Sequence, residues 1–351
     1  MLNFSYKKLR FILSYIYIEE KYRLILIVQL IMQILITGCC GFIGFSYTKF
    51  LLNKYKNIQV IGIDSLDNYY SISLKKKRLE ILKSYNKKFV FYKQNLKNLN
   101  KLENIFKNKR INKLFHFAAQ AGVRYSFIKP RKYIDSNIIS FFNILELSRK
   151  YNVKKFFFAS SSSIYGDTKK LPSTENDISQ EKNLYAISKK FNEKFAKIYS
   201  DKYNMKIIGL RFFTVYGEWG RPDMFMIKYM LSSKFKKNFT LYNFGNHKRD
   251  FTYIKDVVNL IYKVSNSKIN KNYDIFNICS SKPLHLNKIM NLLNKSLGNV
   301  RVFKKKRDFA DVLNTHGSNK KIQKLVGKYN FTKIEDGINK LVIWFNNYYK
   351  K

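Results

Sequence analysis

Between residues 34 and 213, short apolar runs alternate with longer stretches whose apolar residues follow a helical pattern. The apolar runs have the length of buried strands and lie at Ile34–Thr37, Gln59–Ile63, Phe89–Tyr92, Leu114–Phe117, Phe156–Ala159 and Ile207–Phe213. The longer stretches predict helices, notably over 43–54, Arg131–Tyr151 and Leu184–Tyr203. This alternation predicts an α/β fold with a doubly wound parallel sheet.

The pattern changes after residue 213, where the predicted elements become shorter. Helices are predicted near 222–236, 255–265, 286–296 and 335–349. We therefore predict a first domain over 34–213 and a smaller α/β domain over 214–351 that caps the carboxyl edge of the sheet. One apolar run of this second domain, Tyr273–Cys279, is predicted to return to the sheet.

Residues 1–33 form a separate extension. Charged residues at 19–23 divide its apolar residues into two runs, so it contains no span of about 20 apolar residues, and no small-residue cleavage site follows. Met32 immediately precedes the first predicted strand. We interpret Met32 as the natural start and the residues before it as upstream read-through. A weak membrane anchor is the alternative, and stable membrane insertion is not expected.

The composition is that of a folded protein with an unusual charge. The chain has 351 residues, of which 46% are hydrophobic, and a formal net charge of +44. Such a charge is typical of proteins that bind nucleic acid or anionic membranes. However, Lys, Asn, Ile, Phe and Tyr are enriched together, and the lysines are spread along the chain. We interpret the charge as a result of A/T-rich coding and expect no specific nucleic-acid partner. A degenerate polyanion-binding protein is kept as the alternative.

The cysteines and histidines predict no metal site. Cys39, Cys40 and Cys279 show neither a disulfide framework nor metal-ligand spacing, so we expect packing roles and a reducing, cytoplasmic location. The histidines also lack ligand spacing and are interpreted as structural or surface residues; they are His116, His247, His285 and His316.

A glycine-rich turn follows the first predicted strand. Gly38, Gly41 and Gly44 are spaced Gly-x-x-Gly-x-x-Gly, which permits a tight turn and close approach of a pyrophosphate to the backbone. The helix that begins there directs free N–H groups at the phosphates. Asp64 ends the second strand, twenty residues after Gly44, where a carboxylate accepts hydrogen bonds from the adenosine ribose. Together these residues predict a Rossmann-type site for NAD.

A second motif carries the candidate chemistry. Tyr185 precedes Lys189 by four residues, so both side chains lie on one face of a predicted helix. An ammonium in that place is expected to lower the pKa of the phenol and prepare it as a general base for a sugar hydroxyl. A serine run at 160–163 precedes the pair.

With these motifs in order, residues 33–351 resemble the extended short-chain dehydrogenase/reductase family of nucleotide-sugar enzymes. Within that family the chain is most similar to the UDP-glucuronate 4-epimerases. The resemblance is carried by long runs at 64–70, 118–126 and 210–224, of which the last contains Leu-Arg-Phe-Phe-Thr-Val-Tyr-Gly.

The resemblance implies an NAD-dependent isomerase that converts UDP-glucuronate to UDP-galacturonate. Tyr185 would take the proton of the sugar C4 hydroxyl while C4 delivers a hydride to NAD. Lys189 would hold the phenolate and the nicotinamide ribose, and Ser161 would hydrogen-bond the same oxygen. The 4-keto sugar would then turn over and receive the hydride on its other face, with no net oxidation.

Ser162 and Ser163 distinguish the chain from other members of the family. Dehydratases carry an Asp-Glu pair at these positions, and decarboxylases typically carry a glutamate at the second. Hydroxyl groups titrate too high to replace those acids and bases. Epimerisation at C4 remains, with UDP-glucose or an N-acetylated UDP-hexosamine as the alternative substrate.

The family pattern also implies the binding residues. Cofactor contacts are implied at Gly38, Gly41, Phe42, Ile43, Gly44, Asp64, Asn68, Asn95, Leu96, Phe117, Ala118, Ala119, Asn137, Ser160, Tyr185 and Lys189. Substrate contacts are implied at Arg124, Ser162, Ser163, Thr214, Arg221, Arg249 and Asp311. Among these, Arg221 and Thr214 would lie near the sugar carboxylate and Arg249 at the diphosphate.

The chain departs from the family pattern at both ends of the site. Gln94-Asn95 replaces the usual Gly-Asp at the adenine, and 308–313 keeps Asp311 but lacks the usual turn-forming residues. Relatives pair through two long helices, here 131–151 and 184–203, which implies a homodimer.

Overall fold

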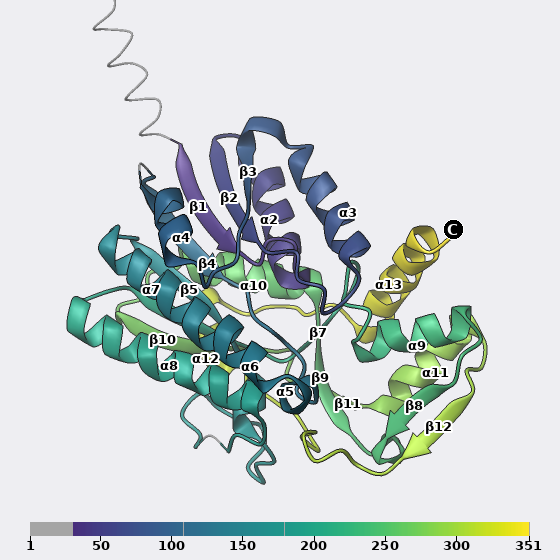
Figure 1. The fold of residues 1–351 in the computed structure, drawn as a ribbon. Coiled ribbons are helices and arrows are strands. Elements are labelled where there is room, and N and C mark those ends of the chain that lie inside the picture. Colours follow the sequence, from purple (N-terminus) through teal and green to yellow (C-terminus); the bar gives the residue numbers. More distant parts are fainter. Residues whose placement is uncertain (1–30, 108, 179, 351) are drawn as a thin grey trace, which may run out of the picture.

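The computed structural model describes residues 31–107, 109–178 and 180–350. A seven-stranded parallel sheet in the order β10-β6-β5-β4-β1-β2-β3 forms its centre (Figure 1). Its strands are β1 (Met32–Thr37), β2 (Ile58–Asp64), β3 (Phe89–Lys93), β4 (Ile111–His116), β5 (Lys155–Ser161), β6 (Ile207–Phe212) and β10 (Tyr273–Ile278). The predicted doubly wound parallel sheet is confirmed.

Helices cover both faces of this sheet. They are α2 (Phe42–Lys54), α3 (Ile72–Lys83), α4 (Leu99–Phe106), α7 (Ser140–Lys150), α8 (Leu184–Tyr203) and α10 (Ile254–Asn266). One core packs α2, α3 and α10 against the sheet, and a second core packs α4, α7 and α8 against the other face. Strand order reverses between β1 and β4, so the carboxyl ends of these two strands open a crevice in which ligands bind in such folds.

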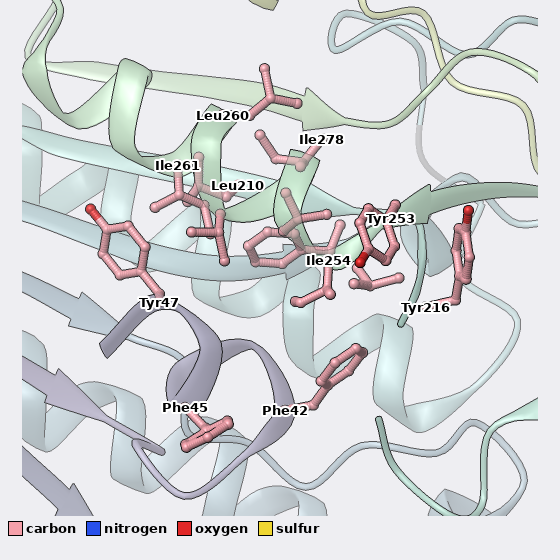
Figure 2. Packing of buried hydrophobic residues seen from close by; sticks show 14 of the residues in the cluster. Phe42, Phe45, Tyr47, Leu210, Tyr216, Tyr253, Ile254, Leu260, Ile261 and Ile278 are labelled. Atoms are coloured by element: carbon pink, nitrogen blue, oxygen red, sulfur yellow. The ribbon is translucent and has the colours of Figure 1, made fainter. Parts of the chain in front are cut away.

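The first core joins segments that are far apart in the sequence. Figure 2 shows Phe42 and Tyr47 of α2 directed at the same apolar layer as Leu210 of β6, Ile261 of α10 and Ile278 of β10. These side chains are all at most 7% exposed. Burial of apolar area on this scale is the main stabilising contribution to the fold, and it fixes α2 and the turn before it against the sheet.

A second group of elements lies beyond the carboxyl ends of the strands. Its strands are β7 (Thr214–Tyr216), β8 (Phe239–Tyr242), β9 (Lys248–Tyr253), β11 (Pro283–His285) and β12 (Val302–Lys305). Its helices are α9 (Phe225–Lys234), α11 (Leu286–Leu297) and α13 (Ile334–Tyr348), while α12 (Lys320–Val326) packs against β10 of the large sheet and against α10. The strands form a three-stranded sheet, β11-β9-β7, and a parallel pair, β12-β8. In Figure 1, α9, α11, β8 and β12 stand together to one side of the large sheet.

Two segments differ from the predicted elements. The helix predicted over 131–151 is divided into α6 (Pro130–Tyr133), a π-helical turn over Ile134–Ile139 and α7, and the short α5 (Tyr125–Ile128) precedes it. A π-turn shifts the register of a helix, which an apolar pattern alone does not reveal. The run Tyr273–Cys279 supplies β10, which pairs in parallel with β6 at the edge of the large sheet although it follows the predicted boundary at 214.

Most of the predicted N-terminal extension lies outside the described residues. The two interpretations of it, upstream read-through and a weak membrane anchor, therefore concern residues that the structure does not describe. Met32 itself is the first residue of β1, which therefore begins two residues before the predicted strand. Within the described ranges, no helix combines the length and apolar character that a membrane crossing requires.

Candidate active site

In the glycine turn between β1 and α2, the glycines pack so closely against backbone atoms that they leave no space for a side chain. Gly38 has φ +71°, and a Cβ there would lie 2.7 Å from the nitrogen of Ala118; a Cβ at Gly44 would meet the carbonyl oxygen of Gly38. Gly41 is the N-cap of α2, and no side chain caps the first N–H groups of that helix. These observations fit a dinucleotide site, because close packing leaves room for a pyrophosphate and the helix terminus offers it free donors.

Asp64 stands at the end of β2, beside this turn. Its two carboxylate oxygens accept the N–H groups of Cys40 and Leu66, at 3.0 and 2.8 Å. Burial raises the pKa of Asp64, and these hydrogen bonds oppose the rise. Cys39, Cys40 and Asp64 place three potential metal-ligand atoms within 4.8 Å of one another. However, burial raises the pKa of the Cys39 thiol well above its usual value, which disfavours the thiolate that a metal needs.

A cavity of about 490 Å³, which we call the first cavity, runs from the glycine turn to Tyr185. Most of the predicted cofactor residues line it, namely Gly38, Gly41, Phe42, Ile43, Gly44, Asp64, Asn95, Leu96, Phe117, Ala118, Ala119, Ser160, Tyr185 and Lys189. Ser161 and Arg221 line it too. Sequence reasoning missed further lining residues, among them Tyr69, Lys75 and Lys132, whose order along the chain follows no recognisable spacing.

The catalytic candidates meet at the carboxyl end of β5. Asn183 caps α8 by accepting the N–H of Ala186 at 2.9 Å, so the helix begins just before Tyr185. One turn later, the ammonium of Lys189 donates to the carbonyl oxygen of Ala159 at 2.8 Å. Ser161 ends β5 and lines the cavity with both residues.

The expected effect of Lys189 on the Tyr185 pKa is wrong for this structure. The Lys189 ammonium is bonded to Ala159 and lies 5.9 Å from the centre of the Tyr185 ring. Burial raises the pKa of Tyr185, and it is the Ser161 hydroxyl and the Arg221 guanidinium that oppose the rise. Burial also lowers the pKa of Lys189 to about 8, against the influence of Glu193. For both groups, burial is the largest influence on the pKa, because it disfavours the charged form.

A second cavity, of about 200 Å³, lies among β8, β9 and the segment before α12. It is lined by Arg124, Thr214, Asp223, Lys228, Tyr242, His247, Arg249 and Asp311, among others. The Arg124 guanidinium is 3.6 Å from the centre of the Tyr242 ring and pairs with Asp311. Arg249 donates to the carbonyl oxygens of Val312 and Leu313, at 2.6 and 2.9 Å. Four of the predicted substrate residues therefore meet here.

Arg221 and Asp223 stand where the two cavities approach each other. Arg221 lines the first cavity and Asp223 the second. The Arg221 Nε donates to Asp223 at 3.0 Å, a second hydrogen bond runs from Nη2, and the Tyr69 hydroxyl donates to Asp223 at 3.2 Å. Among the described residues, Nη1 of Arg221 has no hydrogen-bond partner, so it remains as a donor for a ligand.

Four predicted residues line neither cavity. Asn68 is exposed in the turn after β2. Asn137 is fully buried, where its amide bonds Gln120 at the backbone N–H and carbonyl and donates to the Ser188 hydroxyl at 2.9 Å. Ser162 and Ser163 are half-buried in the turn after β5, where Ser163 accepts a hydrogen bond from Ser161 at 3.1 Å. Asn137 thus contacts Gln120, which lines the first cavity, and Ser163 contacts Ser161, which also lines it.

A buried ion pair behind the first cavity was also missed. Arg211 of β6 binds both carboxylate oxygens of Glu193, each at 2.8 Å, and the two side chains are 3% and 4% exposed. Glu193 follows Lys189 by four residues on α8. Continuing the spacing of Tyr185 and Lys189 by one helical turn would have found it.

The fold and this site define a class of enzyme that binds a dinucleotide beside a tyrosine–lysine pair. Residues 34–279 match the NAD dependent epimerase/dehydratase family. The chain belongs to this family: it is an epimerase, hence an isomerase, and its cofactor is NAD.

Relatives and solved structures narrow the comparison. The chain is 36% identical over 318 residues to the UDP-glucuronate 4-epimerase of Thermodesulfobacterium geofontis. This match covers 88% of this chain and 95% of the relative. The UDP-glucuronic acid 4-epimerase of Bacillus cereus, in complex with UDP-glucuronic acid and NAD, is 28% identical with a TM-score of 0.83, over 91% and 100% of the two chains. The UDP-glucose 4-epimerase of Thermotoga maritima, with UDP-glucose, is also 28% identical, with a TM-score of 0.80 over 90% and 99%. The resemblance to UDP-glucuronate 4-epimerases is therefore confirmed.

Proposed function

We propose that this protein is a UDP-glucuronate 4-epimerase that forms UDP-galacturonate. The observation that carries the proposal is the position of Arg221, whose guanidinium lines the same cavity as Tyr185 and is close enough to lower the pKa of that tyrosine. A guanidinium with a free Nη1 suits a planar sugar carboxylate. The name of the Bacillus cereus neighbour, which binds UDP-glucuronic acid and NAD, supports the same substrate.

The residues of the first cavity fit NAD. The glycine turn and the start of α2 would hold the pyrophosphate, Asp64 would accept hydrogen bonds from the adenosine ribose, and Lys189 would bind the nicotinamide ribose. When bound, NAD supplies the hydride acceptor that C4 oxidation needs and the hydride that reduction needs.

Tyr185 would move the proton in both halves of the reaction. Its oxygen takes the proton of the C4 hydroxyl as the hydride leaves C4, and it returns that proton after the 4-keto sugar has turned over. The positive charge of Arg221 and the hydroxyl of Ser161 favour the phenolate against burial.

The serines after β5 limit the chemistry to epimerisation. Ser162 and Ser163 offer only hydroxyl groups where elimination or decarboxylation would need a carboxyl group. Ser163 supports Ser161 through a hydrogen bond at 3.1 Å. The turn is therefore suited to orient the catalytic serine.

The second cavity would bind the nucleotide. Arg124 and Arg249 supply positive charge for a diphosphate, and the Tyr242 ring already stacks with a planar cation, as it would with a base. Burial lowers the pKa of Arg249 to about 10, so the guanidinium stays charged at neutral pH. Asn95 lines the adenine end of the first cavity without the charge of the usual aspartate.

Purified protein should be incubated separately with UDP-glucuronate, UDP-glucose and UDP-N-acetylglucosamine, and the C4 epimers resolved by chromatography. We expect conversion of the uronate and a 4-epimer as product. Conversion confined to the neutral sugars would contradict the uronate assignment and support the alternative, which the Thermotoga maritima neighbour with UDP-glucose favours. Salt-sensitive RNA binding without any conversion would support the polyanion reading instead.

We further propose the domain division at 213/214, a cytoplasmic location and a homodimer. The three cysteines are buried and free, which fits a reducing compartment. Exposed apolar residues gather on the neighbouring helical segments: Ile134, Ile139 and Phe142 on the π-turn and α7, and Ile187 and Ile198 on α8. Sedimentation should show a dimer that Ile198→Asp weakens.

A further inference from the structure

A chain of hydrogen bonds links the catalytic helix to the catalytic strand. Lys189 of α8 donates to the carbonyl oxygen of Ala159 at 2.8 Å. The next residue of the strand, Ser160, donates from its hydroxyl to Glu193 at 2.5 Å. The residue after that is Ser161, whose hydroxyl lowers the pKa of Tyr185 and lines the same cavity. Two consecutive strand residues are thus fixed to two positions of α8 that lie one turn apart.

The second of these positions is anchored in turn. Arg211 of β6 holds both oxygens of Glu193, and it also donates to the hydroxyl of Tyr165 at 2.7 Å. Ser160 and Arg211 are paired in the parallel register of β5 and β6. A bidentate buried pair has one geometry, so it fixes the distance between strand and helix more firmly than apolar packing does.

We infer that Glu193 is a positioning residue for the reaction. It fixes the strand end that carries Ser161 against the helix that carries Tyr185, and it keeps a carboxylate one helical turn from the Lys189 ammonium. This inference rests on the proposed function. It adds a role for a residue that touches neither substrate nor cofactor and lies behind the cavity wall.

The charge of Glu193 bears on the protonation of Lys189. Lys189 is almost fully buried, and Glu193 opposes the effect of burial on its pKa. The other titratable groups near Lys189 are Tyr185 on α8 and His116 at the end of β4, while Arg211 on β6 lies against Glu193. Burial keeps His116 neutral, so Glu193 is the negative group of this set. Its loss should remove the charge that opposes the effect of burial on the Lys189 pKa.

The test compares three variants of the NAD-bound protein. Glu193→Gln removes the charge, Ser160→Ala cuts the link to the strand but keeps the ion pair, and Asp201→Asn removes an exposed carboxylate of the same helix as a control. Two readouts are used: the pH dependence of kcat, and the pH dependence of Lys189 acetylation by acetic anhydride, resolved by peptide mass spectrometry. The acetylation reports on Lys189 whether or not any sugar is converted.

For Glu193→Gln we expect kcat to fall by about 10- to 100-fold, with a smaller change in KM. We also expect the alkaline limb of the kcat profile and the acetylation midpoint of Lys189 to move to lower pH. Ser160→Ala should lower kcat by about 3- to 10-fold and leave the acetylation midpoint in place, because the carboxylate remains. Asp201→Asn should change neither readout.

An unchanged acetylation midpoint in folded Glu193→Gln would overturn the electrostatic role. If that variant does not fold, Ser160→Ala decides: an unchanged kcat would overturn the positioning role, and the expected loss would support it. If the unmodified protein converts no UDP-sugar, the proposed function fails, and the acetylation shift alone then supports or overturns the role of Glu193 toward Lys189.

Discussion

The glycine-turn end of the first cavity is shaped by backbone groups, whereas the second cavity is lined by charged side chains. In the first, Gly38 and Gly44 pack against backbone atoms, and the start of α2 has no side-chain cap. In the second, Arg124, Arg249 and Asp311 come from segments more than 60 residues apart. A backbone site needs a few residues at fixed spacing, while a side-chain site needs only that suitable residues meet in space. The two cavities should therefore respond differently to substitution.

The largest effect is expected at the chemistry itself. Tyr185→Phe removes the group that takes and returns the C4 proton, so kcat should fall by about 10³-fold. NAD should still co-purify, because the glycine turn is unchanged. Measuring the rate of epimer formation together with the NAD content separates the two effects. Loss of NAD with the activity would show that Tyr185 serves binding and not proton transfer.

Gly44→Ala tests the backbone site directly. The added Cβ would collide with the Gly38 carbonyl, so the turn must open, and NAD affinity should fall by about 100-fold. Equilibrium dialysis with NAD measures this change. Lys49→Ala, on the same helix but away from the turn, is the matched control. Unchanged NAD affinity in Gly44→Ala would contradict the position of the cofactor.

Arg249→Met tests the side-chain site. It removes a half-buried charge and two hydrogen bonds to the segment 312–313, so KM for UDP-glucuronate should rise by about 50-fold while NAD content stays the same. Steady-state kinetics measures KM and kcat separately. The neighbouring exposed Lys248→Met is the control and should change KM little. A fall in kcat alone would place Arg249 with the chemistry and not with the nucleotide.

The smallest effect is expected on the pH dependence of the free energy of unfolding. Burial lowers the pKa of His116 to about 3, below the value of about 6.5 in the unfolded chain. The unfolded state therefore binds the proton first, and stability falls as the pH is lowered below 6.5. Between pH 7 and pH 5 this residue should account for about 2 kcal/mol of the free energy of unfolding. Urea unfolding of the unmodified protein and His116→Gln at both pH values tests it: the loss should be smaller in the variant.

The family resemblance predicted most of the residues that line the first cavity. It did not predict which charges and hydrogen bonds set the pKa values there. The spacing of Tyr185 and Lys189 predicted both side chains on one face of a helix, and both line the first cavity, but it did not reveal that Lys189 bonds the Ala159 carbonyl. The pKa of Tyr185 depends on burial and on Arg221, which lies 36 positions away in the chain. Desolvation and long-range charge have no signature in local spacing.

The sequence by itself determined the parallel sheet, the glycine turn and the helix that carries the tyrosine–lysine pair. Each of these follows from a local period or from a backbone conformation that only certain residues adopt. Tertiary structure decided the π-turn before α7, the Arg211–Glu193 pair and the second cavity. These features depend on which side chains meet after the helices and strands have packed, and packing joins residues whose separation along the chain carries no pattern.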